Sequence, residues 1–501
     1  MIKQKIDWSM ILIPTLLLGI LSLIMQKFPN DSKITLQLIR ELLGDKLSSY
    51  YVFIALLFFL STIYLAFSKY GKVRLGDEEK PSYSNVKWGM MIFTSTMSAD
   101  IIFYSLCEWM MYAKESFVQN RYGGVQEWAM TYSLFHWGPI AWSFYILLAI
   151  AFGYMLHVKG NKKQKFSEAC RPLLGKKVDG ILGKIIDLIA VIALIAGTAT
   201  TFSLSMPLLS SAINDILGIP ENKWLSIAML GAIAVFYTCV SLFGMKGISK
   251  LATICFGMFL MLLIYFFIFG GAQTYIVESG IQSIGNLIQN FVGMSTELDP
   301  LRKYGFVQRW TTYYWSYWMV WCVATPFFIG TISKGRTIKN IILGAYSWGL
   351  AGTYLSFLIL GNYGMFQQLV KKVGILKLVS ADGDYTISIV KVFETMPGSK
   401  FGLLLLILTM IGLYSTVFDS ITMVVSTYSY KELKVGNEPD RKMRLFWAVA
   451  FIILPITLIL TDSSIYNLQS VSIIAAFPIG IVMLLIVFSF YKELRKNNGK
   501  Q

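Results

Sequence analysis

Residues 309–321 read RWTTYYWSYWMVW, and seven of these thirteen residues are aromatic. Trp and Tyr favour the interface between a membrane and water, which suits the rings that follow Arg309. In a membrane helix that rises 1.5 Å per residue, however, Trp318 and Trp321 lie roughly 12 and 16 Å deeper than Trp310. That depth is near the middle of a hydrocarbon layer about 30 Å thick. Because Trp318 and Trp321 are three residues apart, they share one helix face. Rings at this depth either pack between helices or form a binding site.

The composition predicts an all-α polytopic membrane protein. The chain has 501 residues, of which 55% are hydrophobic and 14% are charged, and its mean hydropathy is +0.59. A soluble domain has about 25% charged residues. The apolar residues instead form runs of about 20, long enough to cross a bilayer. We expect twelve transmembrane helices, at residues 9–26, 50–68, 87–113, 131–156, 181–207, 226–243, 251–270, 310–332, 339–361, 402–427, 445–461 and 467–490.

Two connections between the expected helices are long. Residues 271–309 contain the amphipathic stretch IQSIGNLIQNFVGM, which predicts a helix that lies along the membrane surface. Residues 362–401 are polar and rich in Lys.

The net charge of +16 comes mainly from alternate loops. By the positive-inside rule these loops and both termini are cytoplasmic, in a multi-pass protein of a bacterial-type plasma membrane. The basic residues then serve as a topology signal and attract anionic lipid, so we expect no nucleic-acid partner. The tail at residues 491–501 is also basic, and nothing in its sequence shows whether it regulates activity. The start MIKQK leads into an apolar helix without a small-residue cleavage site, which indicates an uncleaved helix.

The sequence contains no pattern typical of a metal site or a catalytic site. The five cysteines have no metal-ligand spacing, so we expect no metal, no cofactor and no disulfide framework. His136 and His157 have no nucleophile or metal partner at catalytic spacing, and we interpret both as interfacial. An enzyme is therefore not expected.

A second aromatic cluster begins the expected fourth helix, HWGPIAWSFY at residues 136–145. At 100° per residue, Trp137, Trp142 and Tyr145 cover an arc of about 140°, so all three rings can face one cavity. Pro139 between them predicts a kink. Several ring faces around one point attract a desolvated cation by about 2 kcal/mol or more per good contact, and quaternary ammonium groups are the usual guests.

Four sequence pieces carry a family resemblance. They are HWGPIAWSFY, DLIAVIALIAGTATTFSLS, FGMKGISKLA and WTTYYWSYWMVW…ISKGRTIKNIILG. Their order and spacing resemble the betaine/carnitine/choline transporter family over about residues 50–490.

The resemblance implies a LeuT-like fold of two inverted five-helix repeats, at residues 87–270 and 310–490. Residues 1–86 would hold two extra helices and a cytoplasmic loop, and 271–309 an extracellular connection. Substrate would bind at mid-membrane, where the first helix of each repeat is discontinuous, and the repeats would rock for alternating access. Relatives are often homotrimers.

The resemblance also implies the residues of the site. The cation cage maps to Trp137, Trp142, Tyr145 and Trp318, with Tyr317 where many relatives have another Trp. Trp321 lies on the path to the cytoplasm. In relatives the third transmembrane helix unwinds against the substrate at a glycine-rich piece, which here reads TMSAD and brings Met97, Ser98 and Asp100 into the substrate site.

Asp100 would lie in mid-membrane, where a carboxylate costs several kcal/mol unless it is paired. The alternatives are a structural carboxyl that is hydrogen-bonded or protonated, a counter-charge for a cationic substrate, and a proton carrier. Some choline-transporting relatives carry Asp at the matching position, which supports the counter-charge. We interpret Glu108 as structural and expect Asp419 to cap or pair internally.

The candidate ion-coupling residues are Ser95, Ser415, Thr416 and Thr198. Sodium-coupled relatives use two adjacent hydroxyl residues in the tenth transmembrane helix, but here Val417 follows Thr416, and Leu194 stands one turn before Thr198. The pattern therefore argues against complete sodium sites and leaves proton coupling, exchange and uniport open.

The sequence thus predicts a secondary transporter of a small, choline-like quaternary ammonium solute. Three alternatives remain: a carnitine- or betaine-type zwitterion exchanger, a transporter of a less methylated amine, and a substrate sensor that no longer transports.

Overall fold

The computed structural model describes residues 5–78, 80–95, 98–161, 163–220, 222–242, 244–380, 383–433, 437–461 and 464–498. Within these ranges, the side chains of residues 95, 240–249, 466 and 497–498 are not described. The described chain is helical, and its β-type pairings include two isolated bridges, Ile6 with Tyr430 and Arg74 with Thr337. The all-α prediction is confirmed.

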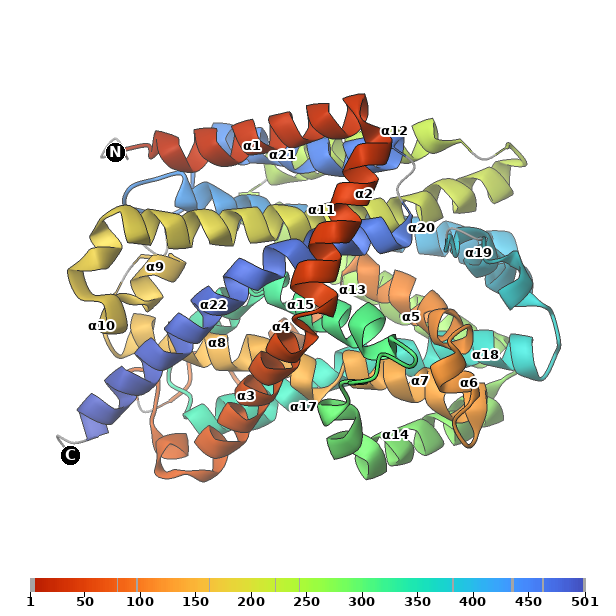
Figure 1. Cartoon of the computed structure of the whole chain (residues 1–501), viewed down its shortest axis with the longest axis horizontal. Helices are drawn as coiled ribbons and strands as arrows, with labels where there is room; N and C mark the ends of the chain where they lie inside the picture. Colours follow the sequence, from red (N-terminus) through yellow and green to blue (C-terminus); the bar gives the residue numbers. More distant parts are fainter. Residues whose placement is uncertain are drawn as a thin grey trace.

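The helices follow one another in the order shown in Figure 1. The α-helices are α1 (Trp8–Lys27), α2 (Pro29–Arg40), α3 (Ser48–Phe67), α4 (Asn85–Ser95), α5 (Ala99–Ala113), α6 (Ser116–Gln119), α7 (Gly124–His136), α8 (Pro139–His157), α9 (Phe166–Ala169), α10 (Arg171–Leu174), α11 (Ile181–Leu217), α12 (Lys223–Leu242), α13 (Gly244–Phe269), α14 (Gln273–Thr296), α15 (Thr312–Trp321), α16 (Thr325–Ile332), α17 (Ile338–Ser356), α18 (Asn362–Leu369), α19 (Thr386–Glu394), α20 (Ser399–Tyr428), α21 (Arg441–Leu460) and α22 (Ile465–Asn498). Short π or 3-10 turns are η1 (Glu41–Asp45), η2 (Lys69–Lys72), η3 (Gly175–Asp179), η4 (Val307–Thr311), η5 (Phe357–Gly361) and η6 (Ile375–Leu378).

Helix occupies each of the twelve expected ranges, but the helices differ in their ability to span a membrane. In the described part of the chain, nine helices are long and apolar enough to cross a bilayer, or ten if the bent pair α4–α5 counts as one. The expected helices at 226–243 and 310–332 are not among these: the first is a shorter apolar helix, and the second is divided into η4, α15 and α16. The amphipathic stretch of residues 281–294 lies within α14, as expected for a helix.

Three of the expected helices are broken. The chain is extended at Ser98, between α4 and α5, which are bent by 66° relative to each other. α7 ends at His136 and α8 begins with Pro139, which has no N–H to donate and is therefore favoured in a first turn. Residues 322–324 separate α15 from α16. Each break leaves backbone groups outside regular helix, a geometry tolerated in membranes only where protein or a cavity surrounds it.

The helices after η4 pack among the helices before α14. α11 lies against α20, α21 and α22, and α8 packs along α16. The last pair approaches closely through glycine: a Cβ at Gly330 would lie 2.6 Å from the Ala149 carbonyl oxygen and 2.8 Å from the Gly153 nitrogen. This contact holds Tyr145 of α8 close to the break between α15 and α16.

The termini and several basic loops lie at one end of the molecule. In Figure 1 both termini lie toward the end that carries α9 and α10, whereas α6 and α19 lie at the opposite end. The pairings at the terminal end join segments far apart in sequence: Ile6 with Tyr430, Arg74 with Thr337, Lys159 with Glu493, Lys163 with Glu432, and Lys334 with Glu78. These loops therefore share one side of the helix assembly, and we call this side the terminal end.

Candidate substrate-binding site

Trp318 of α15 lies among the predicted cage rings. Its ring centroid is 5.6 Å from that of Trp137, 5.8 Å from Trp142 and 4.8 Å from Tyr145, with tilted or edge-on planes. The four rings come from α15, from the α7–α8 break and from α8. These side chains are buried. Trp137 lies in the break, directly after the last residue of α7, and α8 contributes Trp142 and Tyr145.

A cavity of about 600 Å³ lies beside these rings. Trp137, Tyr145, Tyr317, Trp318 and Trp321 line it, whereas Trp142 lies behind Trp318 and is not among the lining residues. Helices α4, α5, α11, α13, α16, α20 and α21 supply most of the remaining lining.

Asp100 lines the cavity at the first turn of α5. Its carboxylate accepts hydrogen bonds from the Ser98 hydroxyl and, at 2.5 Å, from the Tyr317 hydroxyl. Tyr317 in turn shares a hydrogen bond with Thr201 of α11. The positive end of the α5 dipole favours a negative charge at this turn. Asp100 is thus held beside the cage, while Met97 lies outside the described residues.

Between the cavity and the α6 end lies what we call the ring layer: Tyr104, His136, Tyr313 and Tyr314. The Tyr104 and Tyr313 hydroxyls are 2.5 Å apart, and the His136 ring stacks on Tyr314 with centroids 4.7 Å apart. All four side chains are fully buried. The cavity lining on α15 begins only after these residues, at Tyr317.

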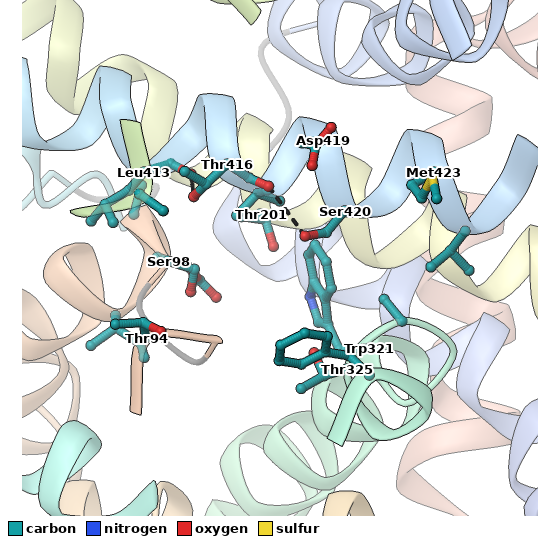
Figure 2. A pocket seen from close by; sticks show the side chains of 18 of the residues that line it. Thr94, Ser98, Thr201, Trp321, Thr325, Leu413, Thr416, Asp419, Ser420 and Met423 are labelled. Atoms are coloured by element: carbon teal, nitrogen blue, oxygen red, sulfur yellow. Dashed lines mark hydrogen bonds between the residues drawn. The ribbon is translucent and has the colours of Figure 1, made fainter. Parts of the chain in front are cut away.

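In the opposite direction the cavity follows α20 toward the terminal end. Figure 2 shows Thr416, Ser420 and Met423 along α20, with Trp321 and Thr325 on the opposite side of the cavity. Asp419 pairs with Arg444 of α21, and Arg444 also donates to the Tyr237 hydroxyl at 3.0 Å. Asp419 and Arg444 also line the cavity. The expectation that Asp419 pairs internally is confirmed.

Glu108 lies behind Trp137 and belongs to a buried hydrogen-bond network. One oxygen accepts from Trp137 Nε1 at 2.7 Å and the other from the Tyr112 hydroxyl at 2.6 Å. His136 Nδ1 is 2.6 Å from the same hydroxyl, and His136 Nε2 is 3.0 Å from Thr311 Oγ1.

The prediction of interfacial histidines is wrong for His136. The packing of α5 and η4 around α7 encloses this ring completely. His157 is half-buried, and its Nε2 lies 3.1 Å from the Gly330 carbonyl oxygen.

The described candidate ion-coupling residues differ in their relation to the cavity. Thr416 lines the cavity, but its hydroxyl donates to the Leu413 carbonyl. The Thr198 and Ser415 hydroxyls also donate to carbonyls of their own helices, and neither residue is among those lining the cavity. The Ser95 side chain lies outside the description. Among the described residues there is no group of three His, Cys, Asp or Glu that could hold a metal ion.

Sequence reasoning missed several polar residues of the cavity wall, among them Thr201 and Tyr414. Thr201 lies three residues after Thr198, so the helical period of GTATT offered a signal. Tyr414 adjoins Ser415, but nothing in the local sequence indicates its hydrogen bond with Ser205.

Comparisons with known proteins cover almost the whole chain. The family model described as betaine/carnitine/choline family transporter matches residues 9–499. A glycine betaine transporter of Bacillus subtilis (strain 168) is 30% identical over 479 residues, covering 93% of this chain and 90% of the relative. A carnitine transporter of Acinetobacter baumannii is 27% identical over 454 residues, covering 90% and 81%. An osmo-dependent choline transporter of Acinetobacter baylyi is 26% identical over 510 residues, covering 100% and 73%. The family and these relatives are transporters, not enzymes.

Proposed function

Because the chain belongs to the betaine/carnitine/choline family of transporters, we propose that it moves a choline-like quaternary ammonium solute across the plasma membrane by alternating access. One arrangement carries the proposal: Trp137, Tyr145 and Trp318 line the same cavity as Asp100. The rings offer electron-rich faces to a cation that cannot donate hydrogen bonds. The carboxylate supplies a counter-charge in a region where an unpaired charge is costly.

Asp100 is the reason for choosing a cation over a zwitterion. Choline has a net positive charge, whereas the carboxylate of betaine or carnitine would be repelled by Asp100 wherever it approached that side chain. A hydroxyl such as that of choline can instead donate to the carboxylate, and such charge-assisted hydrogen bonds are stronger than neutral ones.

A zwitterion such as carnitine or glycine betaine is the second candidate substrate. Relatives named for carnitine and for glycine betaine align with 90% or more of this chain. The trimethylammonium group would occupy the same ring cluster, and a proton on Asp100 would remove the repulsion.

The broken helices fit the transport cycle that we propose. α4–α5 and α15–α16 would be the discontinuous first helices of two inverted repeats, residues 87–270 and 310–490, within twelve transmembrane helices. The terminal end would be cytoplasmic because its loops are basic, and the assembly would be a trimer. We expect coupling by proton, exchange or membrane potential rather than by sodium, since Val417 follows Thr416 and Leu194 stands one turn before Thr198, and neither side chain has an oxygen to offer.

A thermal-shift panel tests the substrate and the ion together. A ligand stabilises the folded protein by RT ln(1 + [L]/Kd), so choline should raise the Tm more than betaine or carnitine, with or without sodium. Uptake of labelled choline into vesicles containing the purified protein then tests transport. Binding without uptake would indicate a sensor, and a larger shift with a zwitterion would favour the second candidate.

A further inference from the structure

Glu108 is a fully buried acid that does not line the cavity, yet it contacts a residue that does. It lies on α5, two turns after Asp100, and its Oε2 accepts the Nε1–H of Trp137 at 2.7 Å. Trp137 reaches the cavity with its ring. The carboxylate therefore lies on the opposite side of a cage ring from the space that a substrate would occupy.

The network around Glu108 holds its carboxyl group close to the indole. Tyr112 donates to Oε1 at 2.6 Å, and the nearest basic side chain among the described residues is His136, whose Nδ1 is 4.0 Å from Oε1. His136 is already within hydrogen-bonding distance of Tyr112 and Thr311. No Lys or Arg of the described chain lies within ion-pairing distance of Glu108, so a cation in the cage would be its counter-ion.

Trp137 differs in this respect from the other two cage indoles. The buried Nε1 atoms of Trp142 and Trp318 have no hydrogen-bond partner in the described part of the chain. A hydrogen bond to an ionised acceptor is short and strong, and it shifts electron density from the N–H into the ring. The attraction of a cation to a ring face is mainly electrostatic, so a more electron-rich ring binds it more tightly.

We propose that Glu108 is a specificity-determining residue: by accepting the Trp137 N–H, it orients that ring and strengthens the preference of the cage for a positively charged ligand. The inference rests on the proposed function, because it concerns the same cage and the same class of substrate. Glu108 would be ionised while a cation occupies the cage, and two effects then act in one direction. The indole face becomes more negative, and the buried carboxylate adds its own attraction through a region of low dielectric. A neutral ligand of the same shape would feel neither.

The test compares two ligands of equal shape and different charge on the full-length protein. Choline carries a trimethylammonium group, and 3,3-dimethyl-1-butanol replaces its nitrogen by carbon. Binding of each is measured by tryptophan fluorescence and by calorimetry on wild type and Glu108→Gln. Glutamine keeps a carbonyl acceptor for the indole and removes the charge. The dissociation constant for choline should rise about tenfold in the variant, while that for the neutral analogue changes less than twofold.

A matched control exists elsewhere in the chain. Glu115 accepts the Nε1–H of Trp310 at 2.8 Å, a second Glu–Trp pair whose members do not line the cavity. Glu115→Gln should leave the ratio of the two dissociation constants unchanged. If Glu108→Gln does not fold, Trp137→Phe replaces it, since the phenyl ring keeps a face but has no N–H for Glu108. The choline constant should again rise several-fold more than that of the analogue.

Equal weakening of both ligands would show a merely structural role and overturn the inference. A dissociation constant for choline that stays at its wild-type value in Glu108→Gln would also overturn it and leave the proposed function intact. Wild-type protein that binds the neutral analogue as tightly as choline would contradict the proposed function itself, and this inference with it.

Discussion

The two sides of the cage differ in chemistry. Packed aromatic rings lie on one side, and on the other side the cavity extends to an ion pair. Toward the α6 end, the ring layer is fully buried, and its members are joined by ring contacts and by the hydrogen bond between the Tyr104 and Tyr313 hydroxyls, while the His136 imidazole bonds to Tyr112 and Thr311 outside the layer. Toward the terminal end, the cavity continues past Trp321 to the ion pair of Asp419 with Arg444. Beyond it lie loops joined by further pairs such as Lys163 with Glu432.

Because of this difference, the two sides should respond differently to salt. Ring contacts depend on buried area and shape and are nearly insensitive to salt, whereas partly exposed ion pairs weaken as salt screens them. In an alternating-access cycle, opening the α6 side would require separating packed rings. Rearranging the terminal end would require exchanging ion pairs. The two movements would therefore have different salt dependence.

The largest effect is expected where the two sides meet. Trp318→Ala removes the ring that contacts Trp137, Trp142 and Tyr145, so it should abolish the quenching of tryptophan fluorescence by choline. The loss of one ring–cation contact of about 2 kcal/mol would weaken binding roughly thirtyfold. Fluorescence titration of purified protein measures this change.

Trp315→Ala is the matched control for Trp318→Ala. Trp315 lies one turn earlier on the same helix, is buried against Phe135 and Phe144, and is not among the residues lining the cavity. It should lower the unfolding temperature through a comparable loss of packing while choline still quenches. Near-normal choline affinity in Trp318→Ala would remove that ring from the site.

We expect the ion pair of Asp419 with Arg444, on the open side, to stabilise the folded protein rather than to affect binding in the cage. Arg444→Met leaves the Asp419 carboxylate partly buried without its partner, which should cost about 2 kcal/mol of unfolding free energy. The double variant with Asp419→Asn should recover part of that loss, because no charge is then left unpaired. Thermal unfolding of the three variants measures the coupling. Strictly additive losses would show that the pair contributes nothing as a pair.

Asp100 should affect selectivity more than overall affinity. Asp100→Gly removes the carboxylate beside the cage, so choline should bind about tenfold more weakly relative to betaine. Competition between the two solutes for one fluorescent signal measures the ratio directly. An unchanged ratio would mean that Asp100 serves only its bonds with Ser98 and Tyr317.

The helical fold and the central rings could be predicted from sequence because both depend on local spacing. Runs of about 20 apolar residues mark helices, and the three-residue interval between Trp318 and Trp321 places both on one face of α15. The same argument from spacing did not predict the position of Trp142. The calculation assumed one continuous helix, but the chain breaks between Trp137 and Pro139, so angles counted across the break do not apply. Trp142 instead packs behind Trp318.

Contacts between distant segments were not predictable. Nothing local to Glu108 indicates that Trp137, 29 residues later, donates to it. Likewise the burial of His136 depends on Thr311, 175 residues away. The packing of α5 against α7 and η4 determines which polar residues surround the cage. This packing cannot be predicted from a single sequence.

The smallest expected effect concerns the loops of the terminal end. Arg171 donates to both oxygens of Glu168 and to Asp179, in the loop between α8 and α11. Burial acts to raise the pKa of Glu168, but hydrogen bonds from Arg171 and Asn161 outweigh it and hold the pKa below the ordinary value of 4.5. Because the folded-state pKa is the lower one, the stabilisation is present above pH 4.5 and is lost as the pH falls through the folded-state pKa.

Arg171→Gln should therefore lower the unfolding free energy at pH 7 by about 0.5–1 kcal/mol, since the arginine is partly exposed and screened. The difference from wild type should shrink as the pH falls below 4.5 and through the lowered folded-state pKa of Glu168. Thermal unfolding over a series of pH values from 7 downward measures this. Lys391→Gln, which removes the exposed pair with Glu394 on α19 at the opposite end, should change the unfolding free energy by less than about 0.5 kcal/mol at pH 7. If the effect of Arg171→Gln on the unfolding free energy does not change with pH, then the ion pair of Arg171 with Glu168 does not contribute to stability. The terminal end would then be stabilised by packing, as the ring layer is.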